Sequence, residues 1–89
     1  MAFYYVYILR SKKDDDWYTG CTENLKIRLR QHQKGQCAST KHRRPLQLIY
    51  FEACLNKGDA LAREQYLKSG PGKRFLKNRL KRSLRALDF

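Results

Sequence analysis

The sequence predicts a single, folded, basic domain of the α/β (α+β) class. The chain has 89 residues, a length that supports one hydrophobic core with two or three strands and a few helices. Hydrophobic residues make up 42% of it, which is ample for that core. Short strand-like runs alternate with segments of helical period along the sequence. We therefore expect one domain over residues 1–89, with its core over about residues 4–80.

The N-terminal region is predicted to form a β-hairpin. Phe3–Leu9 is a run of aromatic and aliphatic residues, and Arg10–Asp16 is polar and turn-prone. Trp17–Thr19 is strand-like again, and Gly20 ends it. Neighbouring loop carboxylates beside lysines are typical of a solvated turn, so we leave Asp14–Asp16 out of the chemistry.

A helix is predicted next, from the N-cap residue Asn24 to the stop signal Gly35. Its leucines, Leu25 and Leu29, have the i, i+4 spacing of one helix face. The same face carries Arg28 and His32. A polar, basic loop over residues 36–44 follows, and after it we expect a strand over residues 46–51 or slightly beyond.

Two further helices are predicted in the C-terminal half. Asn56 caps the second helix, whose inward side is expected to carry Ala60, Leu61, Glu64 and Leu67. Gly70-Pro71 separates it from a third helix with an apolar stripe of Leu76, Leu80, Leu84 and Leu87. The rest of that helix is strongly cationic, from Lys73 to Arg85.

The charge of the chain favours nucleic acid as a partner. Twenty Lys and Arg against eight Asp and Glu give a net charge of +12 and a pI of about 10.0. Nucleic acid is the largest matching reservoir of negative charge in a cell, and an anionic membrane is the weaker alternative.

No stretch approaches the roughly 18 apolar residues of a membrane span. The N-terminus lacks a signal-peptide layout, so we expect a cytoplasmic protein. Three cysteines without a Cys-x-x-Cys pair indicate neither a disulfide framework nor a zinc site.

Two tyrosine triplets carry the most specific signal. Tyr5-Val6-Tyr7 and Tyr18-Thr19-Gly20 are separated by ten residues, so a hairpin brings Tyr7 and Tyr18 to one edge of a sheet. The helix that follows can place Arg28 beside them. A basic, tyrosine-lined site with one carboxylate, Glu64, suits phosphodiester chemistry.

These residues resemble the GIY-YIG endonuclease family. In size the chain is similar to its small single-domain bacterial members, which are related to the N-terminal nuclease domain of the UvrC excision-repair subunit. The triplets stand where the family has Gly-Ile-Tyr and Tyr-Ile-Gly, and the resemblance covers about residues 4–80. Tyr5 replaces the first glycine of the motif. Asn78 is only an uncertain counterpart of a family asparagine, and we assign it no role.

The resemblance implies a metal-dependent endonuclease with a three-stranded antiparallel sheet flanked by helices. Glu64 is then the metal-binding glutamate, holding Mg²⁺ or Mn²⁺, and Arg28 the catalytic arginine that neutralises the transition state. Tyr7 or Tyr18 positions the attacking water and takes its proton, with a phenol pKa lowered by nearby cations and metal. His32 assists. The family link implies repair, recombination or processing of structured DNA as the setting, and RNA is a second candidate substrate.

The cationic side chains outside this site are candidates for phosphate contact. They lie in the first helix, the basic loop, the end of the second helix and the third helix. They are Lys26, Arg30, Lys34, Lys41, Arg43, Arg44, Lys68, Lys73, Arg74, Lys77 and Arg79. For Lys26, Arg30 and Lys34 a solvated charged surface is an equally good explanation.

Each site residue also has an ordinary structural explanation. The two tyrosines can be strand aromatics, Arg28 can bind phosphate without catalysis, and His32 can be a packed histidine with both nitrogens satisfied. Glu64 can pair with Arg63 or Arg28. The rival functions are a non-catalytic nucleic-acid-binding module and a subunit that needs a protein partner to supply specificity. We favour the nuclease because four site residues occur together, namely Tyr7, Tyr18, Arg28 and Glu64.

Overall fold

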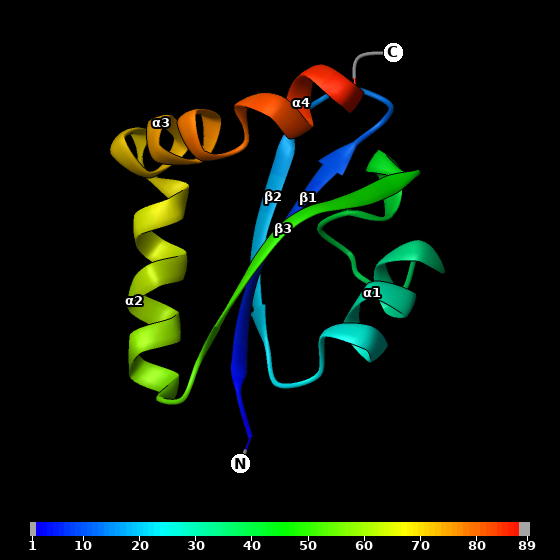
Figure 1. The fold of residues 1–89 in the computed structure, drawn as a ribbon. Helices are drawn as coiled ribbons and strands as arrows, with labels where there is room; N and C mark the ends of the chain where they lie inside the picture. Colours follow the sequence, from blue (N-terminus) through cyan, green and yellow to red (C-terminus); the bar gives the residue numbers. More distant parts are fainter. Residues whose placement is uncertain (1, 88–89) are drawn as a thin grey trace.

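The computed structural model of the chain describes residues 2–87, and the side chains of residues 2–86. Its sheet has three strands, β1 (Tyr4–Ser11), β2 (Trp17–Thr22) and β3 (Leu46–Cys54). They are antiparallel neighbours in the order β2-β1-β3 (Figure 1). The expected three-stranded antiparallel sheet with flanking helices is confirmed. The order puts β1 in the centre and leaves β2 at an edge.

The register of β1 decides which side chains share a face. Tyr7 pairs with Gly20 on β2 and with Phe51 on β3, so these three positions lie on one face of the sheet. Val6 pairs with Cys21, and these two positions lie on the opposite face. A register shift between Ile8 and Leu9 marks a bulge in the β1–β3 ladder.

Helices cover both faces. Helix α1 (Leu25–Gln33) lies on one side of the sheet, and α2 (Lys57–Lys68) lies on the other (Figure 1). Helices α3 (Gly70–Arg79) and α4 (Lys81–Leu87) continue from α2 across the end of the sheet. The core on the α2 side consists of Val6, Ile8, Ala60, Leu67, Leu76 and Leu80. The core on the α1 side is smaller and consists of Tyr7, Leu9 and Leu46, with Leu25 and Leu29 packed against it.

The predicted helix ends are present. The side chain of Asn24 accepts a hydrogen bond from the backbone N–H of Ile27, and that of Asn56 accepts one from Asp59. Gly35 has a φ of 75°, the left-handed conformation that glycine adopts readily after a helix. Within the basic loop, Lys41–Arg43 forms a single 3₁₀ turn that the polar sequence does not reveal.

The C-terminal helix differs from the prediction. The expected single third helix is two helices, because the backbone of Leu80 leaves the helical region with φ −102° and ψ 16°. Leu76 and Leu80 are buried, and the bend keeps Leu84 against the same core cluster. The side chain of Leu87 lies outside the described residues. The inward position predicted for Leu61 is wrong: it is 44% exposed, because it is one residue further round α2 from the buried Ala60.

Three cysteines, Cys21, Cys37 and Cys54, are free thiols. Over the described residues, every helix is too short or too polar to cross a membrane.

Candidate active site

The two tyrosines meet over a glycine on the α1 side of the sheet. The rings of Tyr7 and Tyr18 lie 6.3 Å apart, and Tyr7 is fully buried. Gly20 lies directly opposite Tyr7 in the ladder. A Cβ on Gly20 would lie 2.5 Å from Cζ of the Tyr7 ring, closer than carbon atoms approach without strain. The Tyr7 ring therefore rests against bare backbone, which explains why the second triplet ends in glycine.

A buried chain of hydrogen bonds starts at the Tyr7 phenol. Its oxygen lies 2.8 Å from Nε2 of His32, and Nδ1 of His32 lies 2.7 Å from Oγ1 of Thr40. All three side chains are fully buried. The His32 ring also lies edge-on to both tyrosine rings, at 5.7 Å from Tyr7 and 5.2 Å from Tyr18. The imidazole is thus a packed histidine with both nitrogens satisfied, and it is at the same time bonded to one of the two candidate catalytic phenols.

Arg28 completes the cluster from the next turn of α1. Its guanidinium interacts with the Tyr7 phenol, and this interaction raises the pKa of Arg28. Nη1 of Arg28 donates a hydrogen bond to Oε1 of Gln31 at 3.1 Å. Because a guanidinium can only donate, the Tyr7 oxygen can act toward Arg28 only as an acceptor. The proton of the Tyr7 hydroxyl is then free to point at Nε2 of His32.

Electrostatics at the cluster correct one expectation. The phenol pKa of Tyr7 or Tyr18 was expected to be lowered by nearby cations and metal. In this structure burial raises the pKa of Tyr7 to about 12, and the interaction with Arg28 offsets only part of the rise. The pKa of His32 is lowered, mainly by burial and then by the charge of Arg28. At neutral pH, therefore, Tyr7 carries its proton and His32 is a neutral acceptor.

Thr40 is the residue of this cluster that the sequence did not reveal. It lies eight residues after His32, in a basic loop whose composition indicates only irregular structure. The loop is fastened to the hairpin, because the hydroxyl of Ser11 donates to the backbone carbonyl of Arg43 at 2.6 Å. Since Ser11 is also fully buried, this bond holds the loop firmly enough to place Thr40 against the imidazole. No local sequence signal connects the two segments.

Glu64 lies on the other side of the sheet from the tyrosines. It belongs to α2, and its charge contributes to the raised pKa of Cys21, a thiol on the α2 face of β2. Its carboxylate is 15% exposed and lies 3.4 Å from the ammonium of Lys68, one helical turn on. Arg63, considered as its partner, instead forms a bidentate pair with Glu52 at 2.9 Å. Glu64 and Arg28 therefore flank the edge strand β2 from opposite faces.

Glu64 fits a metal that takes few protein ligands. Among the described residues, no group of three His, Cys, Asp or Glu side chains converges as a metal site. Mg²⁺ and Mn²⁺ prefer oxygen, and Mg²⁺ commonly keeps several waters and binds one or two carboxylates plus substrate phosphate. A single carboxylate whose ion-pair partner is the half-exposed Lys68 meets that requirement.

A chain of hollows follows the free edge of β2 and links these side chains. The first is lined in part by Trp17, Arg43, Lys73 and Lys77. The second shares Trp17 and Lys73 with the first and adds Tyr18. It also contains Lys68, the partner of Glu64. The first two hollows share residues, and the third begins two positions further along β2, at Cys21. We call the three hollows together the β2 edge track.

The third hollow of the β2 edge track lies at the start of α1. It is lined by Cys21 on the strand and by Arg28 and Gln31 on the helix. It also contains Glu23 and Asn24, the residues that connect β2 to α1. The track therefore runs from the cationic α3 past Tyr18 to the arginine that contacts Tyr7.

The predicted phosphate-binding residues divide into two groups. Some already have protein partners: Arg44 donates to the carbonyls of Lys41 and Gln33, Arg43 lies 3.7 Å from Asp14, and Lys68 pairs with Glu64. The others have exposed side chains. They are Lys26, Arg30, Lys34, Lys41, Lys73, Arg74, Lys77 and Arg79.

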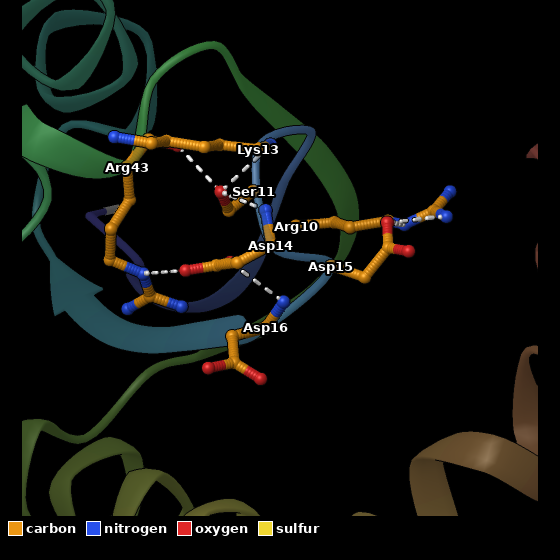
Figure 2. Close-up of polar contacts among 7 residues, drawn as sticks. All are labelled: Arg10, Ser11, Lys13, Asp14, Asp15, Asp16 and Arg43. Carbon is orange, nitrogen blue, oxygen red and sulfur yellow. Dashed lines mark hydrogen bonds and ion pairs between the residues drawn. The ribbon is translucent and has the colours of Figure 1, made fainter.

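The three aspartates of the turn form local contacts within the hairpin and with the neighbouring loop. Arg10 binds Asp15 at 2.8 Å, while Asp14 accepts a hydrogen bond from the backbone N–H of Asp16 (Figure 2). Figure 2 also shows Arg43 reaching Asp14 on the other side of the turn. Asp15 has a φ of 62°, a conformation that aspartate tolerates better than most residues. This arrangement agrees with the solvated turn predicted for them.

Comparison with known proteins shows the family of this chain. The model of the GIY-YIG catalytic domain family matches residues 3–81, which include both triplets, Arg28, His32 and Glu64. The chain belongs to the GIY-YIG family. Small members of that family are similar over most of the chain. A UPF0213 protein of Clostridium perfringens is 48% identical over 65 residues, covering 72% of this chain and 69% of that protein. A UPF0213 protein of Staphylococcus haemolyticus is 43% identical over 70 residues, covering 78% and 84%.

A solved structure supports the fold. The solution NMR structure of a UPF0213 protein from Bacillus halodurans matches with a TM-score of 0.54 at 34% identity. The match covers 88% of this chain and 84% of that chain. The GIY-YIG domain architecture thus extends over most of this chain.

Proposed function

We propose that this GIY-YIG protein is a metal-dependent endonuclease that hydrolyses phosphodiester bonds in DNA, acting in the cytoplasm on damaged or structured DNA. One observation carries the proposal: the oxygen of a buried phenol, Tyr7, lies 2.8 Å from Nε2 of the neutral imidazole of His32, and the guanidinium of Arg28 interacts with the same phenol. A phenol that only filled a core would need one hydrogen-bond partner, whereas Tyr7 has both a base and a cation at its hydroxyl end. The family membership and the net charge of +12 support the same substrate class.

The resting contacts suggest how the proton of the attacking water is removed. In the free protein Arg28 interacts with the Tyr7 phenol, and a scissile phosphate competes for the same guanidinium because Arg binds phosphate oxygens in paired hydrogen bonds. When Arg28 turns to the phosphate, a lone pair on the Tyr7 oxygen becomes available to a water. Arg28 then faces the charge that develops on the phosphorus oxygens.

Proton transfer proceeds through the buried chain. As the water oxygen bonds to phosphorus, its proton passes to the Tyr7 oxygen, and the phenol passes its own proton to Nε2 of His32. This concerted route fits a phenol with a pKa of about 12, because a free phenolate never has to accumulate. Thr40 holds Nδ1 of His32, which fixes the orientation of the ring and leaves Nε2 as the acceptor.

Departure of the 3′ or 5′ oxygen completes the reaction as the bond from phosphorus to that oxygen breaks. A divalent cation held by Glu64 would stabilise the negative charge on the leaving oxygen. Glu64 supplies a carboxylate at the β2 edge for that ion, and Lys68 beside it offers a second cation to the phosphate. Tyr18, partly exposed at the same edge, lines the path by which the phosphate reaches Arg28.

The proposal is tested by incubating the purified protein with supercoiled plasmid and with flap and branched DNA, in Mg²⁺ or Mn²⁺. Cleavage should disappear with EDTA and in Glu64→Gln and Arg28→Ala, while DNA binding persists. Asp59→Asn, which removes an exposed carboxylate from the same helix, should cleave like the wild type. Binding without metal-dependent cleavage of DNA would contradict the nuclease and favour the partner-dependent or purely binding alternatives. Parallel RNA substrates show which nucleic acid is preferred.

A further inference from the structure

An aromatic groove lies beside the proposed active site on the α1 face. It has a volume of about 510 Å³ and is lined by Tyr5, Phe51, Leu25 and Leu29, with Lys26 at its rim. Phe51 is 49% exposed, although it is a large aromatic residue in the middle of β3. Neither ring is needed by the hydrogen-bonded cluster at Tyr7. Exposed aromatic surface in a hollow of this kind commonly marks a binding site.

We infer that this groove holds an unpaired nucleobase of the nucleic-acid substrate, stacked against Tyr5 and Phe51. The inference rests on the proposed nuclease and names its substrate class: DNA with a single-stranded or extruded nucleotide next to the cleavage site. Three observations carry it.

The first observation is the position of the groove. Phe51 is the cross-strand neighbour of Tyr7, and Tyr5 lies two positions before Tyr7 on the same face of β1. Neighbouring positions in a sheet are about 5–7 Å apart, roughly the distance between successive nucleotides of a single strand. The groove also shares Glu23 and Asn24 with the third hollow of the β2 edge track. A strand that follows the track past Arg28 thus reaches the groove.

The second observation is the geometry of the rings. The centroids of Tyr5 and Phe51 lie 6.0 Å apart and their planes are inclined by 59°. The two rings therefore pack against each other at an incline, within the usual range of aromatic pairs, while Phe51 remains 49% exposed. A flat base can stack on this exposed aromatic surface, as bases do in proteins that bind single strands.

The third observation is the distribution of charge. The groove is mostly apolar, and its two charged lining residues, Glu23 and Lys26, have opposite signs. An apolar groove without net charge, in a chain of net charge +12, matches a nucleobase, which is uncharged and attached to an anionic backbone. A second copy of this chain carries the same net charge of +12, so charge repulsion opposes its approach.

Tyr5 gives the groove one of its walls. It stands where the family motif usually has glycine, and glycine there would leave Phe51 without a partner ring. The substitution costs the sheet nothing, since tyrosine suits a strand. A residue outside the proposed chemistry thus contributes to the selection of substrate.

The test measures binding of the full chain in EDTA, so that it does not depend on cleavage. The probe is a DNA duplex with one unpaired 2-aminopurine at a flap junction, compared with the same base in a perfect duplex. Stacking should quench the unpaired probe, and Phe51→Ala should weaken binding of the flap about fivefold to a hundredfold while leaving perfect-duplex binding unchanged. Phe51→Trp should retain the quenching. The matched control is Leu61→Ala, because Leu61 is a similarly exposed apolar residue, at 44%, on the α2 side of the sheet.

Two results would overturn the inference: equal flap binding by Phe51→Ala and the wild type, or a dimer of the free protein in sedimentation that Phe51→Ala dissociates. Quenching without any metal-dependent cleavage would support the stacking site and refute the nuclease. Metal-dependent cleavage of flaps that is insensitive to Phe51→Ala would support the nuclease and refute the stacking site.

Discussion

Gly20→Ala is the sharpest test of the active-site geometry. The added methyl carbon would lie 2.5 Å from Cζ and 2.9 Å from Cε1 of Tyr7, and ordinary carbon contacts lie at about 3.5 Å or more. The ring must therefore move by about 1 Å. Such a shift is large compared with the tolerance of the 2.8 Å contact between Tyr7 and His32, so that bond is broken or badly misaligned.

Two quantities should change together in Gly20→Ala. Cleavage should fall about 100-fold, because a misplacement of about 1 Å in a catalytic group costs that much. The free energy of unfolding should fall by about 1–3 kcal/mol, as is usual for overpacking, which lowers Tm by several degrees in a domain of this size. The assays are a metal-dependent cleavage time course, thermal unfolding by circular dichroism, and the ring-nitrogen NMR shifts of His32.

The matched control is Gly70→Ala, whose added carbon would meet only Nη1 of Arg74, at 3.8 Å. This variant should cleave like the wild type and leave the His32 signals in place. The reasoning is refuted if Gly20→Ala cleaves within about twofold of the wild type and its His32 ring-nitrogen shifts are unchanged, because Tyr7 would then tolerate the methyl group without leaving its hydrogen bond.

Three further predictions concern the surroundings of the site. Thr40→Val keeps the shape of the side chain but removes the hydrogen-bond partner of His32 Nδ1. It should lower the free energy of unfolding by about 1–3 kcal/mol, shift the His32 tautomer in NMR and reduce cleavage, while Thr40→Ser restores all three. Equal behaviour of the two variants would contradict proton transfer through Tyr7 and His32. Burial lowers the pKa of His32, so as the pH falls the unfolded chain binds a proton at this residue before the folded protein does. The free energy of unfolding should therefore keep its full value above about pH 6.5 and decrease below it, by at most about 1.4 kcal/mol per pH unit. Urea titrations should show this slope reduced in His32→Asn and unchanged in the exposed His42→Asn; an identical slope in all three proteins would argue against it. Arg63→Lys should lose the bidentate pair with Glu52 and about 1 kcal/mol of stability without affecting cleavage, and a parallel loss of cleavage would show that this pair serves the site as well.

Local sequence signals predicted most of the elements. Asn24 and Asn56 cap helices because an Asn side chain can accept a hydrogen bond from the backbone two or three residues ahead, wherever the helix lies. The spacing of Arg28 and His32 on one face follows from the helical period alone. The sequence could not predict the break at Leu80 or the exposed position of Leu61, since both depend on how α2, α3 and α4 pack against the same core cluster.

The candidate site was only partly predictable for the same reason. The two triplets and the hairpin between them indicated that Tyr7 and Tyr18 meet, because strand pairing is a short-range rule. Thr40 gave no signal, since its place beside His32 depends on the bond from Ser11 that fastens its loop to the hairpin. The pKa of Tyr7 was expected to fall and is raised, because the degree of burial is a property of the packed core and outweighs the charge of a neighbouring arginine.

By itself, then, the sequence determined the fold class, the family resemblance and the identity of the residues suited to phosphodiester chemistry, because these depend on residue type and short spacings. The tertiary structure alone decided that Tyr7, His32 and Thr40 form one buried hydrogen-bonded chain and that Glu64 stands across the edge strand from Arg28. It also decided that Tyr5 and Phe51, far apart in the sequence, form a tilted aromatic pair beside them. Such long-range contacts follow from strand order, register and the faces that the helices cover, and no local pattern encodes these.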